Sequence, residues 1–465
     1  MAALRKRQNI NYMILLTQKR VRWQRSAVYW ARSVTLLVFL GAVSIPAFGQ
    51  AEDSRTHPAT LGEVLTRDWG GVRPRLAEKG IDFSGFWQND YFADPSVGNT
   101  QGIKGTGDWS RIRGTLDIDM DRLAHVKGLS FHITSTLNQG LDVMGDNRYM
   151  DSLVGDGNDS INHQLRLDSW WVRQELLHGM ITLSVGQISG FDFFGYIPQD
   201  FSHFVTLGPF YAPFALYNSF SSADPMTTPA VLMRVMPNKH FRYRTMIQSI
   251  TEGNPSDPKS VLGFYNWYNN PSGTSTQMKD GAVWHNELAY LYGSGHAQFG
   301  VSYSGARAYT KWSGNASNGT LVTLPGFRKN SSAGYENYYW ILKQTVFRPT
   351  PGSNRGVVLG GTYVWGPADK GVLAFNRQLV TTAEFNGLLP RRPSDSINFS
   401  FNYLGIRGPL KTPTFQSEKV YEFSYSFQVT RWLQWLPDLQ VHQDINANPR
   451  NGTGVAVGFR SLVTF

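Results

Sequence analysis

The chain has 465 residues, no cysteine, and 44 Lys and Arg against 34 Asp and Glu, which gives a formal net charge of +10. The absence of cysteine excludes a disulfide framework and a thiolate metal site. Eight basic residues and no acidic ones lie in the first 49 residues, so the remainder carries 36 basic against 34 acidic residues, and a nucleic acid partner is not expected.

Residues 1–49 predict a signal peptide for export. A basic stretch precedes the apolar run Val34–Ile45, and Ala47 and Gly49 stand at the small-residue positions before Gln50. The apolar run is too short to span a bilayer, which needs about 20 residues. We therefore expect cleavage after residue 49; the alternative is an amphipathic anchor that stays attached.

Residues 50–80 are predicted to form an N-terminal segment with a single short helix, in the sequence DWGGVRPRLAEKGI. Pro74 suits the first helical position, because proline has no N–H to place in the helix. Gly80 suits the position just past the helix end.

Alternating segments of roughly ten residues recur from residue 81 to residue 465 and predict an all-β chain. In residues 81–92, Phe83 and Tyr91 share one face, and Gln88 and Asp90 share the other. The same period appears in residues 111–122, 129–138, 421–429 and 454–465. Glycine-, asparagine- and proline-rich clusters between such segments are typical of turns and surface loops.

The segment RIRGTLDIDMDR, residues 111–122, sets Arg and Asp on one strand face and Ile, Leu and Met on the other. A basic residue facing hydrocarbon near the membrane midplane would cost roughly 2 to 4 kcal/mol. The charged face must therefore be wet or paired. A membrane barrel with a polar lumen and a soluble sandwich both satisfy this requirement.

The two ends of the chain carry a family resemblance. LTRDWGGVRPRLAEKGIDF, residues 65–83, resembles the opening of the carbohydrate-selective porin family, OprB, and residues 433–465 resemble its final hairpin with an aromatic last residue, Phe465. Between them, residues 385–406 resemble an internal strand pair with an Arg-Pro-x-Asp turn. The resemblance extends from about residue 61 to residue 465.

The resemblance implies a transmembrane antiparallel β-barrel of the outer-membrane type, with about 16 strands, over residues 81–465. It also implies a porin in the bacterial outer membrane that passes mono- or oligosaccharides into the periplasm by diffusion. The expected partners are sugars as solutes, outer-membrane lipid and lipopolysaccharide. A homotrimer and a monomer are both open.

Charged side chains on the polar faces are the candidates for the solute path, because a sugar pore needs hydrogen-bonding groups that replace lost water without binding tightly. Each candidate either contacts the solute or forms an ion pair within the wall. In residues 165–172, Trp170 and Trp171 occupy both strand faces, and one is expected to join an interfacial aromatic girdle. The candidates are Arg111, Arg113, Asp117, Asp119, His132, Arg166, Asp168, Glu422 and Arg460.

Residues 190–217 are rich in aromatic side chains and have no clear period. The segment could fold into the lumen, where Phe191, Phe193, Phe194 and Tyr196 would stack on sugars. The alternative is packing under an extracellular loop or at the membrane boundary.

Other chemistries have little support in the sequence. We find no G-x-S-x-G motif and no P-loop, so neither an enzyme nor a cofactor is expected. Residues 156–164 lack the glycine and terminal Glu of a calcium loop, and the histidines form no zinc-type pair. Two alternative functions remain: an exported all-β enzyme acting on polysaccharides, and a barrel serving as a surface receptor or adhesin.

Overall fold

The computed structural model describes residues 64–96, 105–140, 152, 165–195, 201–210, 212, 215–216, 219, 227–249, 282–307, 311–312, 327–328, 333–367, 375–406 and 416–465. The signal peptide predicted for residues 1–49 and the calcium loop considered at 156–164 lie outside these ranges. In the described part of the chain, no helix is long and apolar enough to cross a membrane.

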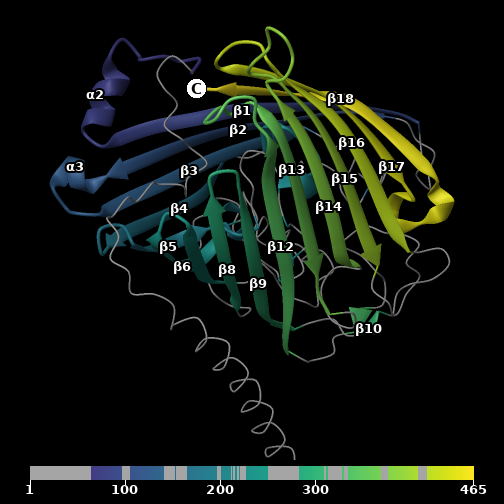
Figure 1. Ribbon diagram of the computed structural model, residues 1–465. Helices are drawn as coiled ribbons and strands as arrows, with labels where there is room; N and C mark the ends of the chain where they lie inside the picture. Colours follow the sequence, from purple (N-terminus) through teal and green to yellow (C-terminus); the bar gives the residue numbers. More distant parts are fainter. Residues whose placement is uncertain are drawn as a thin grey trace, which may run out of the picture. The chain divides into compact units, whose positions relative to one another are not determined.

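Sixteen antiparallel strands among the described residues close into a barrel, so the predicted fold is confirmed (Figure 1). Each strand pairs with its neighbours along the chain, and β1 pairs with β18 to close the ring. The barrel strands are β1 (Ile81–Ser96), β2 (Gly105–Asp119), β3 (Leu129–Gly140), β4 (Leu165–Leu176), β5 (Ile181–Ile188), β6 (Thr228–Asn238), β7 (Phe241–Ser249), β8 (Ala282–Tyr292), β9 (Gly295–Arg307), β12 (Ala333–Phe347), β13 (Gly356–Trp365), β14 (Phe375–Asn386), β15 (Ser396–Ile406), β16 (Ser417–Gln428), β17 (Leu433–Gln443) and β18 (Thr453–Thr464). A separate two-stranded sheet pairs β10 (Lys311–Trp312) with β11 (Phe327–Arg328).

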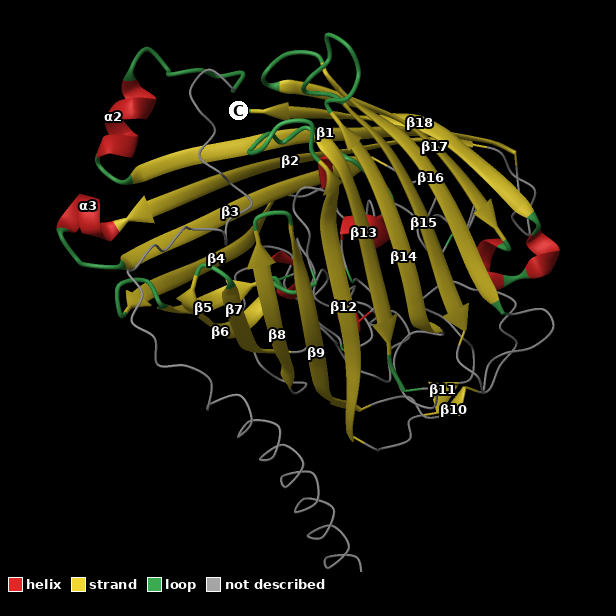
Figure 2. Cartoon of the chain, viewed as in Figure 1, coloured by secondary structure: helices red, strands yellow, loops and turns green. Residues whose placement is uncertain are grey.

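Short helices lie between or before the strands, and Figure 2 shows α2 and α3 at the same end of the barrel. They are α2 (Val72–Glu78), α3 (Met120–Ala124), α4 (Leu207–Phe210) and the 3-10 turns η1 (Gly190–Asp192), η5 (Ile445–Ala447) and η6 (Pro449–Asn451). The helix predicted before the first strand is α2, with Gly80 just past its end at φ +83°. Pro74 takes the third helical position, not the predicted first, and it still needs no intrahelical hydrogen bond there.

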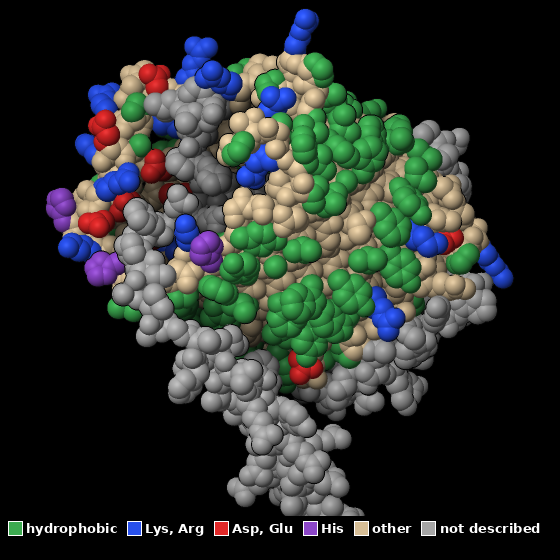
Figure 3. All heavy atoms as spheres, viewed as in Figure 1, with side chains coloured by type: hydrophobic (Ala, Val, Ile, Leu, Met, Phe, Trp, Pro, Cys, Tyr) green, Lys and Arg blue, Asp and Glu red, His purple; other side chains and the backbone are tan. Residues whose placement is uncertain are grey.

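The two faces of the wall differ as the alternation predicts. Ile112 on β2 and Phe423 on β16 are exposed on the outer face, whereas Arg111 and Glu422 beside them are buried inside the barrel. Figure 3 shows the resulting apolar surface over the strands that face the viewer, with Lys and Arg gathered towards its edges. The soluble-sandwich alternative is excluded, because its core would be apolar and its outer surface polar.

The seam between the first and last strands is closed by backbone pairing and by the last residue. The Phe465 N–H donates to the Gly85 carbonyl at 2.9 Å, and the Leu65 N–H donates to the Thr464 carbonyl at 2.9 Å. A Cβ at Gly85 would lie 2.6 Å from the Phe465 ring, so only glycine leaves room for this aromatic side chain. The alternating C-terminal strand is confirmed as part of the barrel.

The strand predicted over residues 111–122 ends three residues early. β2 stops at Asp119, whose carboxylate accepts from the N–H groups of Asp121 at 2.9 Å and Arg122 at 3.3 Å. This is an N-cap, and it turns the chain into α3. The strand prediction for Met120–Arg122 is therefore wrong, because the local capping bond outweighs the alternation.

The turn between β14 and β15 is held by Asp395. Its carboxylate accepts from Arg392 at 2.6 and 3.0 Å, from the Gln428 N–H at 3.1 Å, and from the Tyr425 hydroxyl. Burial opposes ionisation of this carboxyl, but these hydrogen bonds outweigh it and lower the pKa of Asp395 below its ordinary value. The ionised carboxylate thus ties two neighbouring hairpins together.

We predict that Asp395→Asn lowers the free energy of unfolding by about 1 to 3 kcal/mol, because charge-assisted bonds to a buried acceptor are lost. Since the folded pKa of Asp395 is depressed, its stabilisation is present above the unfolded pKa and is lost as the pH falls through the folded one. The difference from wild type, measured by denaturant unfolding in detergent, should therefore shrink as the medium is acidified below about pH 4.

Asp121→Asn is the matched control, because Asp121 is an exposed acid in α3, away from this turn. An equal loss of stability in both variants, or a difference that does not depend on pH, would contradict the role given to Asp395.

Candidate functional site

The inner face of the barrel is built from charged and amide side chains, and the charges separate by side. Six buried arginines lie on β2 to β7, where the only buried acid among the described strand residues is Asp168. Four buried acids and no buried Lys or Arg lie on the described parts of β14 to β17. These two arcs stand on opposite sides of the ring of sixteen strands. The arginines are Arg111, Arg113, Arg166, Arg234, Arg242 and Arg244, and the acids are Glu384, Glu418, Glu422 and Asp438.

Two predicted arginines of the basic arc, Arg111 and Arg113, have partners in the wall and in η1. Arg111 donates to the Asn138 amide oxygen at 3.1 Å and stacks its guanidinium 5.7 Å from the Trp109 ring. Arg113 lies 2.9 Å from Asp168 and 3.9 Å from Asp192. Both arginines are buried on the inner face, so the structure brings them together as the alternation predicts.

Arg166 and Asp168 share the inner face of β4, and each side chain is fully buried. A bulge between β3 and β4 then shifts the alternation, because Asp168 and Ser169 are consecutive and both point inward. The shift turns Trp171 into the barrel and leaves Trp170 half-exposed on the outer face. The sequence showed a tryptophan on each face, and the bulge decides which one is inside.

His132 and Asp117 form a pair at the edge of the basic arc, where the His132 Nδ1 lies 2.6 Å from the carboxylate. The imidazole also stacks on the Trp171 ring at 3.7 Å between centroids. Asp119, in contrast, caps α3 at the barrel end and pairs with Arg122 at 3.2 Å. It therefore does not belong with the other candidates on the lumen wall.

Arg460 on β18 is the most completely engaged of the candidates. Its guanidinium donates to both carboxylate oxygens of Asp90 on β1 at 2.7 Å. It also donates to the carbonyls of Phe204 at 3.0 Å and Phe201 at 3.2 Å, and it lies 4.9 Å from the Phe201 ring. One buried side chain therefore joins the seam of the barrel to a segment inside it.

That segment comprises residues 189–219, between β5 and β6, and we call it the crossing segment; the structure describes 189–195, 201–210, 212, 215–216 and 219 of it. On one side, the Gly195 N–H donates to Glu287 at 3.0 Å, and Arg244 donates to the Phe193 carbonyl at 2.5 Å. On the other side, the N–H groups of Val205 and Thr206 donate to Glu422. The crossing segment thus spans the lumen between the two charged arcs.

Two more wall residues hold the middle of the crossing segment. His203 lies 2.8 Å from Glu384, which is also paired with Lys343 at 2.7 Å. The His203 carbonyl accepts from the Ser424 hydroxyl. In this way the acidic arc binds backbone and imidazole groups of the crossing segment.

The aromatic side chains of the crossing segment are packed, not offered to a solute. Phe191, Phe193 and Phe194 are at most 3 % exposed and form an apolar cluster with Trp171 and Phe204. The segment therefore enters the lumen, but these three rings cannot stack on a passing sugar. Tyr196 lies outside the described residues.

Several wall residues were missed by sequence reasoning. Asp90, Glu287 and Glu384 stand at inward positions of alternating strands, so their faces could be assigned from the period alone. Their partners could not, because Arg460 is 370 residues from Asp90. Within the described ranges, no group of three or more His, Asp or Glu side chains could hold a metal ion.

Comparisons with known proteins agree with this geometry. The family model described as carbohydrate-selective porin, OprB family, matches residues 108–465. Porin B of Pseudomonas aeruginosa is 22 % identical over 445 residues, which cover 88 % of this chain and 92 % of the relative. Among solved structures, the high-pH structure of Pseudomonas putida OprB has a TM-score of 0.74 at 17 % identity and covers 87 % of this chain and 99 % of its own. A Salmonella typhi OmpF complex has a TM-score of 0.53 at 10 % identity, over 84 % of this chain and 99 % of that one.

We predict that Arg460→Ala lowers the free energy of unfolding by about 3 to 5 kcal/mol, because Asp90 is left as a buried charge without its main partner. The double variant Asp90→Asn with Arg460→Ala should recover part of this loss, since the buried charge is gone. A double-mutant cycle measured by denaturant unfolding in detergent tests the coupling; additive losses would contradict it.

Proposed function

Because the chain belongs to the carbohydrate-selective porin family, OprB, we propose that its lumen is the path by which neutral sugars cross the outer membrane into the periplasm by passive diffusion. The protein is a porin, and its closed barrel provides the wall of the channel. We further propose that residues 1–49 act as the export leader, and that outer-membrane lipid and lipopolysaccharide surround the apolar outer face.

The observation that carries the proposal is the balance and separation of the lumen charges. Eight basic and eight acidic side chains are buried on the described parts of the barrel strands. The basic ones are the six arginines of β2 to β7 with Lys343 and Arg460, and the acidic ones are Asp90, Asp94, Asp168, Glu287, Glu384, Glu418, Glu422 and Asp438. These buried charges of the described strands therefore balance, and their separation onto opposite arcs directs an electric field across the lumen.

Such a lumen suits a neutral solute with many hydroxyl groups. Sugar hydroxyls donate to carboxylates and accept from guanidinium groups, so a sugar can exchange its hydration for wall contacts on both sides at once. Ion pairing within the wall weakens each individual contact, because every group is shared with a neighbour. Weak, repeated contacts allow the solute to leave, as diffusion requires.

The crossing segment supports selection by size. Arg244 in the basic arc and Glu422 in the acidic arc hold it from both sides, so it narrows the lumen as a fixed structure. Because its described phenylalanines pack on one another, polar wall groups and backbone carry the solute contacts. Among the predicted candidates on the lumen wall, Asp117 has a side chain that is 37 % exposed, so we propose that Asp117 touches the sugar.

The alternatives predict different behaviour. A receptor or adhesin would bind ligands at its outer loops without passing them, and a polysaccharide-acting enzyme would release products. Family and fold both belong to channels. A folded protein that stays silent in a bilayer would remove the channel proposal and direct attention to polysaccharide cleavage.

We predict stepwise conductance when the protein, without residues 1–49, is reconstituted into planar bilayers, and saturable block of that conductance by glucose or an oligosaccharide. Asp117→Ala should raise the half-blocking sugar concentration by about tenfold, since one charge-assisted hydrogen bond is lost. Asp117→Glu should recover part of the effect by keeping the charge.

Glu78→Ala is the matched control, because Glu78 is an exposed acid on α2 outside the lumen. Conductance without sugar block would keep the channel but refute the sugar contacts. A shift of equal size in the Glu78 variant would refute the role of Asp117.

A further inference from the structure

The outer face of the barrel carries a groove that the channel does not use. It has a volume of about 640 Å³ and lies over β13 to β17. On the outward positions of these strands, Leu359, Ala383, Phe399, Phe423 and Leu439 form one cross-strand row. Thr381, Phe401, Tyr421 and Val441 form the next row, and both rows line the groove.

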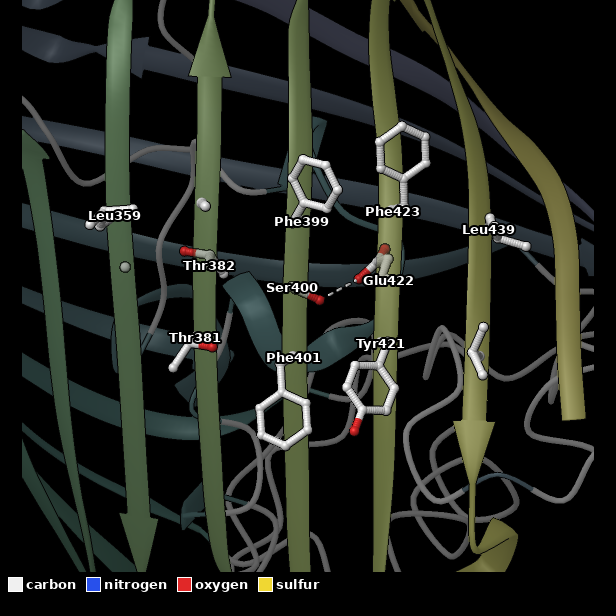
Figure 4. A pocket seen from close by; sticks show the side chains of 13 residues that line it. Leu359, Thr381, Thr382, Phe399, Ser400, Phe401, Tyr421, Glu422, Phe423 and Leu439 are labelled. Atoms are coloured by element: carbon white, nitrogen blue, oxygen red, sulfur yellow. Dashed lines mark hydrogen bonds between the residues drawn. The ribbon is translucent and has the colours of Figure 1, made fainter. Parts of the chain in front are cut away.

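Aromatic pairs and small side chains give the groove its form. The rings of Phe399 and Phe423 are 5.0 Å apart, and those of Phe401 and Tyr421 are 5.1 Å apart. Figure 4 shows the two pairs on either side of the level at which Ser400 and Glu422 are hydrogen-bonded. Ala383 and Thr381 beside the rings are small, so the surface is hollowed there. The exposed lining is almost wholly apolar and suits a hydrocarbon chain.

A strongly basic rim lies at one end of this groove. Three consecutive hairpin turns, residues 348–355, 387–395 and 429–432, contain five arginines and a single acid, Asp395. The side chains of Arg348, Arg355, Arg391 and Arg431 are exposed. The fifth, Arg392, is paired with Asp395. The rim therefore carries a net positive charge of about +4 on the surface next to the apolar groove.

Hydrogen bonds hold the three turns side by side. Arg355 donates to the Gly387 carbonyl at 2.7 Å, which joins the first turn to the second. Arg392 donates to the Gln428 carbonyl at 3.1 Å and lies 4.2 Å from the Phe427 ring, which joins the second turn to the end of β16. The positive charges are thus gathered on a fixed part of the surface, not spread along mobile chains.

The distance from rim to groove fits one lipid molecule. Leu359 and Ala383 each lie three residues from the strand end that meets the turns. Three residues of a strand rise about 10 Å. An anionic headgroup at the arginines would therefore place its acyl chains directly in the groove.

We propose that this surface is a binding site for an anionic phospholipid of the periplasmic leaflet. Short turns mark the periplasmic end of an outer-membrane barrel, and the three arginine-containing turns are among the short connections of this chain. Guanidinium groups bind the phosphate, and the groove between Leu359 and Leu439 holds an acyl chain. This inference rests on the membrane placement proposed above, but not on sugar passage.

The test is native mass spectrometry of the folded protein in a nonionic detergent, with phosphatidylglycerol or phosphatidylcholine added. We expect wild type to retain phosphatidylglycerol with at least tenfold higher affinity than phosphatidylcholine. The triple variant Arg348→Ser, Arg391→Asn and Arg431→Ser should bind both lipids equally. Arg391 has φ +63°, which asparagine tolerates, so the turn is preserved.

Two matched controls distinguish binding at this site from the general effects of surface charge and of an added large side chain. Lys79→Ser, Lys127→Ser and Lys239→Ser remove the same charge from exposed turns at the same end of the barrel but outside the rim, and they should keep the preference for phosphatidylglycerol. Ala383→Phe fills the groove and should weaken binding of both lipids, whereas Val231→Phe on the outer face of β6 should not.

Equal binding of the two lipids by wild type, or equal losses in the arginine and lysine variants, would overturn the proposal. The proposal would also be overturned if the mass spectrum showed an oligomer of wild type that the Ala383→Phe variant did not form. The groove would then be an interface between copies of the chain. Bilayer conductance of the arginine variant should match wild type, so a failure of this proposal is distinguishable from a failure of the channel proposal.

Discussion

The architecture depends on one constraint: a backbone that passes through hydrocarbon must satisfy all of its N–H and C=O groups internally. A closed sheet does this without edges, and the pairing of β1 with β18 completes it here. Closure in turn gives the sheet an inner and an outer face. Because side chains alternate along each strand, every second one faces the lumen and the others face lipid. The charges of the lumen and the rings of the outer face both follow from that division.

The buried charges then serve two purposes at once. Glu287, Glu422 and Arg460 hold the crossing segment, while the arginines of β2 to β7 and the acids of β14 to β17 form opposed arcs on either side of it. An ion-pair network of this kind costs desolvation, which close pairing and hydrogen bonds within the wall offset. The pairs of Arg460 with Asp90 and of Arg113 with Asp168 show this arrangement.

Much of the fold could be predicted from the sequence, because alternation depends only on neighbouring residues. The faces of Arg111, His132, Glu422 and Arg460 were correct for this reason. Features that depend on one local hydrogen bond or one extra residue could not be predicted from alternation. The N-cap at Asp119 and the bulge beside Ser169 are examples. The packing of the phenylalanines in the crossing segment could not be predicted from the sequence either, because they contact Trp171, which is brought near them only by the tertiary fold.

The bond from Arg460 to Asp90 links the last strand, the first strand and the crossing segment. The carbonyls of Phe201 and Phe204 receive this guanidinium donor only where β18 pairs with β1. Closing the wall and fixing the crossing segment therefore depend on the same side chain, and a sheet that is not closed lacks the support that narrows the lumen.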